Sequence, residues 1–214
     1  MTPGPATAGT AAPGPAAPGP AAPGPATSGP AGGLLPTPSQ TIGPFLAMGM
    51  EPLERRDVVP ATTPGAVVLT GTVLDGDGVP VPDAMLELWQ SGPDGRFDTG
   101  AGPDGDQPWF GRSLTDAAGR YGFTTMKPAP VALRTGEPQA PHVELLVFAR
   151  GLLRPVRTRV YFPDEAAANG ADPVLGAVPP ERRSTLVAVA VAEGGGLTFD
   201  IRLQGAAETV FFAC

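Results

Sequence analysis

The chain has 214 residues, a formal net charge of −7 at pH 7 and only 16% charged residues, and this acidic balance disfavours binding to nucleic acid or to an anionic membrane surface. Its single cysteine, Cys214, excludes an internal disulfide framework and a cysteine-based zinc site. Its single histidine, His142, excludes a three-histidine zinc site and an iron site built from two histidines and a carboxylate.

The first 35 residues repeat the motif AAPGP at residues 11–15, 16–20 and 21–25, with almost no charge or large apolar side chain. Such a segment cannot bury enough apolar surface to offset its chain entropy, and its prolines favour extended structure. The sequence therefore predicts a disordered extension over residues 1–35 and a folded domain over residues 36–214. A proline-rich ligand for a recognition domain is the alternative interpretation of the extension.

The beginning of the chain has neither the basic region nor the apolar core of a signal peptide. No run approaches the roughly 20 apolar residues that a membrane-spanning helix needs. We therefore expect a cytoplasmic protein.

Residues 36–45 read PTPSQTIGPF, a loop rich in hydroxyl and amide side chains whose prolines and glycine exclude a long helix. Its polar groups either serve the turns of the loop or form the wall of a ligand site. The residue types alone favour turn chemistry.

From residue 66 onward, short apolar runs alternate with turn signals, which predicts an all-β fold, an antiparallel β-sandwich with long loops and one or two short helices. The expected strands lie at 67–74, 84–90, 110–114, 119–125, 145–149, 157–162, 185–192 and 197–204. The last of these has the cleanest alternation of apolar and polar residues. A helix is expected only at 165–169, capped by Asp164, with a helical turn at 181–184.

The run around Leu145 is apolar on both faces, which predicts a buried strand that begins near His142 and ends at Arg150. Such a strand can place these two polar groups near a cavity. Alternatively, His142 is a structural histidine with satisfied hydrogen bonds and Arg150 is a solvated strand end. The residues alone favour the second interpretation.

The chain has no G-x-S-x-G, H-E-x-x-H or phosphate-binding G-x-x-x-x-G-K-[ST] motif. A Ser-His-Asp triad would have to use His142, and no serine stands in a recognisable activating context. Taken alone, the chain lacks the residues for most known enzyme chemistries.

Several segments, in this order along the chain, resemble the intradiol ring-cleaving dioxygenases: TPSQTIGPF, FGRSLTDAAGRYGFTTMKP, APHVELLVFARGLL, TRVYFPDE and FDIRLQGAAETVFF. The resemblance runs over residues 37–212 and is strongest to the alpha subunit of heteromeric members. It implies a β-sandwich in each subunit, a homologous beta subunit that holds ferric iron, and a hetero-oligomer of alpha–beta pairs. The implied reaction inserts both atoms of O2 into protocatechuate to give 3-carboxy-cis,cis-muconate.

The resemblance also implies that this chain binds no iron itself. Iron-binding subunits hold the metal with two tyrosines and two histidines. Here their His-x-His motif reads His142-Val143-Glu144, one expected tyrosine is Val131, and the other has no counterpart after Phe97. His142 would then be a relic of the metal site.

Four residues of this chain match family positions that line the active site shared by alpha and beta subunits: Arg150, Thr41, Pro44 and Phe45. The guanidinium of Arg150 suits a substrate carboxylate or developing negative charge, and the hydroxyl of Thr41 can donate to an oxygen. Pro44 and Phe45 would form the wall of the substrate pocket. Many relatives have tyrosine at the position of Phe45.

Two other interpretations remain open. Residues 67–125 also match a transthyretin-like or carboxypeptidase-regulatory-like sandwich, which is often a non-catalytic binding module, but this leaves the segments at Thr41 and Arg150 unexplained. A self-sufficient iron dioxygenase is the third interpretation, and the missing tyrosine and histidine argue against it. A copurifying homologous chain with an intact metal motif would distinguish among the three.

Overall fold

The computed structural model describes residues 37–43, 45–97, 109–192 and 195–213. The chain divides into two units, residues 1–38 and 39–214. The predicted extension of residues 1–35 lies outside the described residues, so its disorder and its boundary stay predictions.

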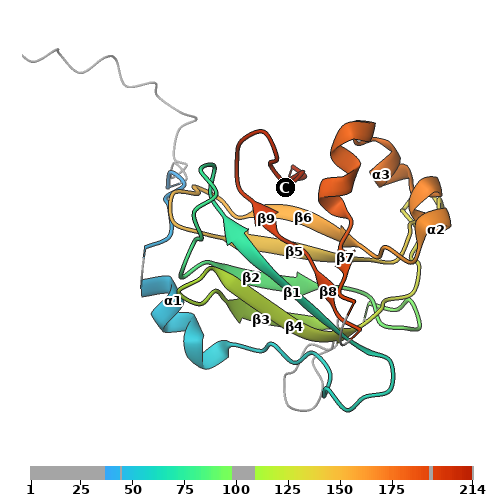
Figure 1. Ribbon diagram of the computed structural model, residues 1–214, viewed down its shortest axis with the longest axis horizontal. Coiled ribbons are helices and arrows are strands. Elements are labelled where there is room, and N and C mark those ends of the chain that lie inside the picture. Colours follow the sequence, from blue (N-terminus) through green and yellow to red (C-terminus); the bar gives the residue numbers. More distant parts are fainter. Residues whose placement is uncertain (1–36, 44, 98–108, 193–194, 214) are drawn as a thin grey trace, which may run out of the picture. The chain divides into compact units, whose positions relative to one another are not determined.

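Residues 39–214 form a β-sandwich of two sheets (Figure 1). The first sheet contains β1 (Ala66–Leu74), β4 (Arg120–Met126), β7 (Val189–Ala190), β8 (Leu197–Thr198) and β9 (Ile201–Arg202), in the order β4-β1-β8-β7 with β9 also paired to β1. The second contains β2 (Met85–Trp89), β3 (Phe110–Leu114), β5 (His142–Phe148) and β6 (Val156–Tyr161), in the order β3-β2-β5-β6. The prediction of an all-β sandwich is confirmed. The pairing is antiparallel except that β8 and β9 run parallel to β1.

The core lies between the two sheets and follows from the alternation of side chains along each strand. The second sheet directs five aliphatic side chains of β2 and β5 inward, and each is fully buried: Leu86, Leu88, Val143, Leu145 and Val147. Residues of the first sheet cover them: Leu69, Val73, Tyr121, Phe123, Phe199 and Ile201. The prediction that the strand around Leu145 is a buried sandwich strand is therefore confirmed.

The strand expected at 197–204 is broken into β8 and β9, which corrects the sequence prediction. At the break, the side chain of Asp200 accepts a hydrogen bond from the backbone N–H of Thr72 at 2.8 Å, in place of a backbone acceptor. The carbonyl of Phe199 instead accepts a bond from the hydroxyl of Tyr121 at 2.6 Å. A Cβ atom at Gly71 would lie 1.9 Å from this carbonyl, so only glycine fits there.

The strand expected at 185–192 is also wrong over most of its length. Residues 180–186 form the 3-10 helix η2 (Pro180–Leu186), and only β7 is a strand. The hydroxyl of Thr185 explains part of this, because it donates to the carbonyl of Arg182 and accepts from the N–H of Val210. These side-chain bonds favour a tight turn over an extended conformation.

The helices of the described residues are all short, and none could span a lipid bilayer. They are α1 (Phe45–Met50), η1 (Glu51–Leu53), α2 (Ala166–Ala171), α3 (Pro173–Gly176) and η2. The helical turn predicted at 181–184 is confirmed as part of η2, whereas α1 and α3 were not predicted. Figure 1 shows α1 on the side of the sandwich opposite to α2 and α3.

The predicted cap of α2 is wrong. The carboxylate of Asp164 binds the ammonium of Lys127, and Glu165 is the N-cap residue without a capping side-chain bond. The capping side chain in this region is Asp172, which accepts from the N–H groups of Val174 and Leu175 at 2.8 Å each and so begins α3.

Candidate functional site

Strand β5 connects the two groups of residues that the sequence singled out. His142 is its first residue, and Arg150 lies in the turn just beyond its end. A strand of seven residues spans about 20 Å, so these two residues belong to separate places on the molecule. The interpretation that places both residues near one cavity is therefore wrong, since the cavity that His142 lines does not include Arg150.

The start of β5 borders a cavity of about 270 Å³. It is lined by Trp89, Gln90, Ser91, Phe97, Val131, His142 and Glu144. The structure thus brings together His142, Glu144 and Val131, at which the family resemblance predicts the relic of a metal site. We call this the relic cavity.

His142 is buried in the wall of the relic cavity, with only 8% of its surface exposed. Its Nδ1 lies 2.8 Å from the carbonyl oxygen of Ala140, which can only accept, so Nδ1 carries the proton. Burial, and then the nearby charge of Arg159, lower the pKa of His142 below its ordinary value, although Glu144 opposes this. The imidazole is therefore neutral at pH 7 and its Nε2 is an acceptor.

Glu144 is bound within the chain. Its carboxylate accepts from Nε and Nη2 of Arg159 at 3.2 and 3.0 Å, and Nη1 of Arg157 lies 3.7 Å away. The guanidinium of Arg159 is only 12% exposed, donates to Gln139 at 2.7 Å and lies over the ring of Phe212. A fixed cation thus already neutralises the carboxylate that replaces the second histidine.

The two tyrosines of the chain do not line the relic cavity. The hydroxyl of Tyr121 donates to Phe199, and burial raises its pKa well above the ordinary value. The hydroxyl of Tyr161 lies 3.2 Å from a carboxylate oxygen of Asp172, and burial raises its pKa to about 12. Neither phenol is placed to become a tyrosinate ligand.

The residues of the relic cavity do not fit a ferric iron. They offer one imidazole, one carboxylate that is already paired with arginine, and Val131 where a phenolate would be needed. Among the residues that the structure describes, no group of three or more His, Cys, Asp or Glu could hold a metal ion.

At the other end of β5, Arg150 and Gly151 form a turn that two distant segments hold. Nε of Arg150 lies 3.2 Å from Oδ1 of Asp83, and 54% of the arginine side chain is exposed. The hydroxyl oxygen of Thr41 accepts a hydrogen bond from the N–H of Gly151 at 2.7 Å. Gly151 has a φ of +90°, a conformation that glycine adopts without strain. The structure therefore brings Thr41 and Arg150 to the same turn.

The contact of Thr41 changes its expected role. Its oxygen already accepts from Gly151, and its hydroxyl lies 3.4 Å from the carbonyl of Ile42. Nearby, Nε of Arg154 lies 3.4 Å from the hydroxyl of Ser39. These contacts attach residues 39–42 to the turn, so in this chain Thr41 positions the loop as well as offering a polar group.

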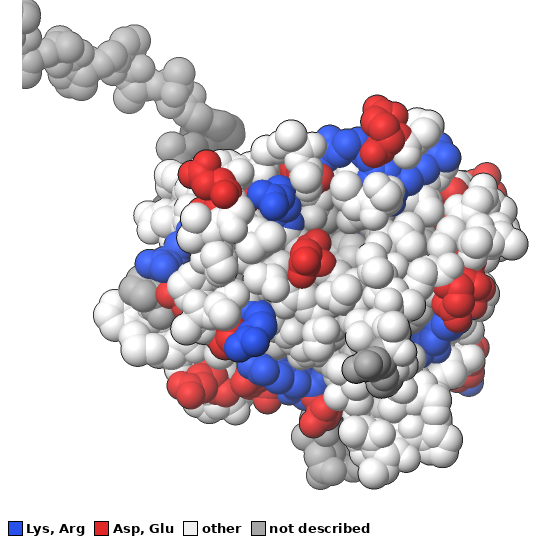
Figure 2. Space-filling view, viewed as in Figure 1, with Lys and Arg blue, Asp and Glu red and all other residues white. Residues whose placement is uncertain are grey.

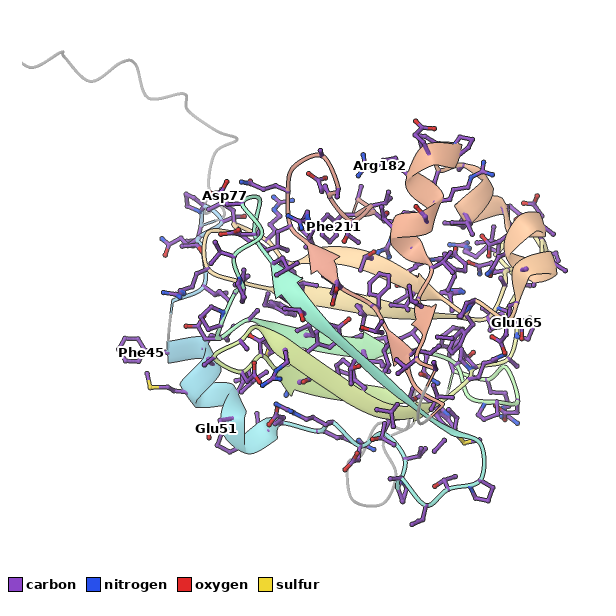
Figure 3. The ribbon with its side chains drawn as sticks, viewed as in Figure 1. Phe45, Glu51, Asp77, Glu165, Arg182 and Phe211 are labelled. Carbon is purple, nitrogen blue, oxygen red and sulfur yellow. The ribbon has the colours of Figure 1, made fainter. Side chains whose placement is uncertain are left out.

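Phe45 is the first residue of α1, and its ring is 77% exposed. Figure 3 shows it pointing away from the ribbon, on the side of the view opposite to Glu165. Pro44 lies outside the described residues. The ring of Phe45 therefore does not complete a pocket within this chain. We call Thr41, Asp83, Arg150 and Gly151 the arginine corner.

Sequence reasoning missed Asp83 and Arg159. Asp83 adopts a φ of +57°, and aspartate is among the few residues that tolerate this left-handed conformation. Its place after two prolines signals a turn, but nothing in the sequence names its partner. The partner of Arg159 is Glu144, which β5 and β6 place directly opposite it in register. The pair could therefore be found only from the pairing of β5 with β6.

Figure 2 shows one face of the molecule, on which acidic and basic residues are interspersed and leave a broad uncharged area. This face has no continuous basic field of the kind that attracts nucleic acid.

Comparisons with known proteins agree with these features. A family model described as Dioxygenase matches residues 50–205, more than half of the chain. The chain belongs to this dioxygenase family. It is 44% identical to a protocatechuate 3,4-dioxygenase alpha chain of Burkholderia cepacia, over 82% of this chain and 96% of the relative. It is 39% identical to the alpha chain of Pseudomonas putida, over 84% and 97%.

The chain is also similar to a protocatechuate 3,4-dioxygenase beta chain of Burkholderia cepacia, at 32% identity over 65% of this chain and 64% of the relative. Among solved structures, a mutant of catechol 1,2-dioxygenase from Acinetobacter radioresistens matches with a TM-score of 0.53 and 19% identity, over 72% of this chain and 57% of that chain. That match shows the fold alone. The dioxygenase match covers far more of the chain than residues 67–125, which the binding-module interpretation explained.

Proposed function

We propose that this chain is the alpha subunit of a protocatechuate 3,4-dioxygenase. The enzyme cleaves protocatechuate with O2 between its two hydroxyl-bearing carbons and gives 3-carboxy-cis,cis-muconate. The ferric iron is held by a homologous beta subunit, and alpha–beta pairs assemble into a larger hetero-oligomer. This chain contributes side chains of the arginine corner to the substrate pocket.

The observation that carries the proposal is the similarity to alpha chains over nearly their whole length. The relic cavity supports the assignment of the iron to the beta subunit, because its donor atoms do not suit iron. The similarity to a beta chain supports a partner with a related fold. Two related sandwiches that pair in this way are a common route to a shared site at a subunit interface.

Within this proposal, Arg150 binds the carboxylate of the substrate. Among the described residues its ion pair is formed by Nε, at 3.2 Å from Asp83, and the side chain is more than half exposed. A guanidinium held at Nε can present Nη1 and Nη2 as a planar pair of donors, which matches a carboxylate. Thr41 and Asp83 hold the turn and the guanidinium in place, while Pro44 and Phe45 form the pocket wall.

The decisive experiment compares the full-length chain purified alone with the same chain coexpressed with a homologous beta chain. We expect the isolated chain to hold no stoichiometric iron and to lack a visible tyrosinate-to-iron absorption band. The copurified complex should contain iron and consume O2 when protocatechuate is added. The beta chain expressed alone is the control for the contribution of this chain.

One iron per isolated chain together with a tyrosinate band would contradict the proposal and favour a self-sufficient dioxygenase. Failure to assemble with a beta chain, with no effect on its oxygen uptake, would favour a non-catalytic binding module.

A further inference from the structure

The relic cavity contains groups that could bind a ligand without iron. Most of its polar side chains are occupied inside the chain. The amide of Gln90 donates to the carbonyl of Met126 at 2.8 Å and accepts from the hydroxyl of Thr125 at 2.8 Å. The hydroxyl of Ser91 lies 3.3 Å from the carbonyl of Ala129.

Glu144 is occupied as well, since Arg159 binds its carboxylate through two nitrogens. Arg157 also lies 3.7 Å from this carboxylate, and neither guanidinium is among the residues that line the cavity, so no charged group of the wall is left for a ligand. A charged ligand would gain little here and would lose its hydration.

The imidazole of His142 keeps one ring nitrogen available in the cavity wall. Nδ1 of His142 donates to Ala140, and among the described residues no hydrogen-bond partner accompanies Nε2. The ring is 8% exposed and lines the cavity. Because the imidazole is neutral, this atom offers a lone pair and accepts one hydrogen bond.

The remaining wall is apolar and partly aromatic. Trp89 and Phe97 line the cavity, and both keep exposed ring surface, 41% and 61% of each residue. Val131 adds an aliphatic surface. Exposed aromatic rings beside a cavity favour contact with another flat ring. In another protein a cavity of about 150 Å³ holds benzene, so 270 Å³ has room for a substituted ring.

We propose that the relic cavity binds a small, uncharged phenol, with the ring against Trp89 and Phe97 and the phenolic hydroxyl donating to Nε2 of His142. The ligand that fits this cavity has one hydrogen-bond donor, a flat apolar body and no charge. An aromatic ether of the same shape lacks the donor, and an aromatic carboxylate at neutral pH brings a charge for which the cavity has no free partner.

The test uses the full-length chain labelled with 15N-histidine. Because the chain has a single histidine, its imidazole spectrum reports on His142 alone. Two ligands of nearly equal shape, 4-methylphenol and 4-methylanisole, are titrated while the 15N shift of Nε2 and the heat of binding are recorded. We expect 4-methylphenol to shift the Nε2 resonance saturably and to bind roughly two- to tenfold more tightly than the ether, the ratio expected for one net hydrogen bond.

Two variants make the test specific to the cavity. His142→Phe keeps a ring of similar size but removes Nε2, and we expect it to abolish the preference for the phenol over the ether. Val131→Phe fills the cavity without touching the histidine, and we expect it to weaken both ligands. If His142→Phe does not fold, Val131→Phe and the ligand pair still decide the question.

Equal affinity for the two ligands, or phenol binding without a change at Nε2, would overturn the proposal. Binding that is unchanged in Val131→Phe would place the ligand elsewhere. None of these readouts involves oxygen uptake or the iron content of the partner, so the result is independent of the proposed enzymatic activity.

Discussion

The two ends of strand β5 differ in how their polar side chains are paired. At its start, the polar groups of the relic cavity find their partners within the chain, and His142 is buried. At its end, the arginine corner leaves 54% of the Arg150 side chain exposed. Most polar side chains at the first end are paired within the chain, whereas the second end leaves the guanidinium of Arg150 accessible to solvent.

Because the two ends differ in this way, we expect the first to contribute mainly to stability and the second mainly to function. The pair of Glu144 and Arg159 is mostly buried and fixes the register of β5 against β6, so it contributes to the fold. The pair of Arg150 and Asp83 is largely exposed, and such pairs add little to stability. The proposed role of Arg150 is therefore in binding rather than in folding. The following predictions test that separation.

The largest effect should come from Glu144→Ala at the closed end. The change leaves Arg159, which is 12% exposed, without its carboxylate, so the free energy of unfolding should fall by about 3 kcal/mol. Urea unfolding of the full-length chain measures this. Asp164→Ala is the control, because Asp164 is 65% exposed and Lys127 keeps Glu165 as a partner; we expect a loss below about 1 kcal/mol. Equal losses of stability in the two variants would contradict the expected difference between the buried and the exposed ion pair.

The next largest effect should be on catalysis, from Arg150→Ala at the open end. Loss of a charge-assisted contact to the substrate carboxylate should reduce kcat/KM for protocatechuate about ten- to a hundredfold in the assembled complex. Iron content and assembly should not change. Arg150→Lys should restore only part of the activity, because an ammonium lacks the planar pair of donors. A variant that keeps wild-type kinetics, or one that cannot assemble, would count against the binding role.

A smaller effect is expected from Asp83, which holds Arg150 through Nε. Both Asp83→Asn and Asp83→Gly suit its φ of +57°, so the backbone should be preserved. The KM for protocatechuate should rise about two- to fivefold, as expected for an exposed ion pair. In the Arg150→Ala background, Asp83→Gly should add nothing. An equal effect in both backgrounds would show that Asp83 acts on the fold rather than on Arg150.

The smallest effect concerns pH at the closed end. Burial and Arg159 lower the pKa of His142, while Glu144, Asp172 and the bond to Ala140 act in the opposite direction. The unfolded chain therefore binds a proton on this histidine more readily than the folded chain does. Stability is fully present above about pH 6.5 and declines as the pH falls toward the lower pKa of the folded state.

The measurement is the free energy of unfolding as a function of pH, for the wild type and for His142→Phe. The variant should show a flatter profile just below about pH 6.5, because it has no group that titrates there at this position. Identical slopes would mean that His142 keeps its ordinary pKa in the fold.

Much of the sandwich could be predicted from local patterns, and the errors have identifiable causes. The strands around Leu69, Leu88 and Leu145 follow from apolar alternation, which is a local property. The strand at 197–204 has the same pattern but is interrupted, since Asp200 bonds to Thr72 across the sheet. The helix cap was assigned to Asp164 because the sequence does not show that Lys127 binds it.

The sequence by itself determined which donor atoms exist: one histidine, valine at position 131 and an arginine after the buried strand. These identities limit the chemistry in any fold. Only the tertiary structure decided which groups are occupied, because the partners are 15 residues apart for Glu144 and Arg159, 67 for Asp83 and Arg150, and 110 for Thr41 and Gly151. Local patterns contain no information about such pairs, since strand register and loop packing bring them together. A half-exposed guanidinium at one end of β5, and at the other an imidazole nitrogen without a partner among the described residues, are consequences of the fold.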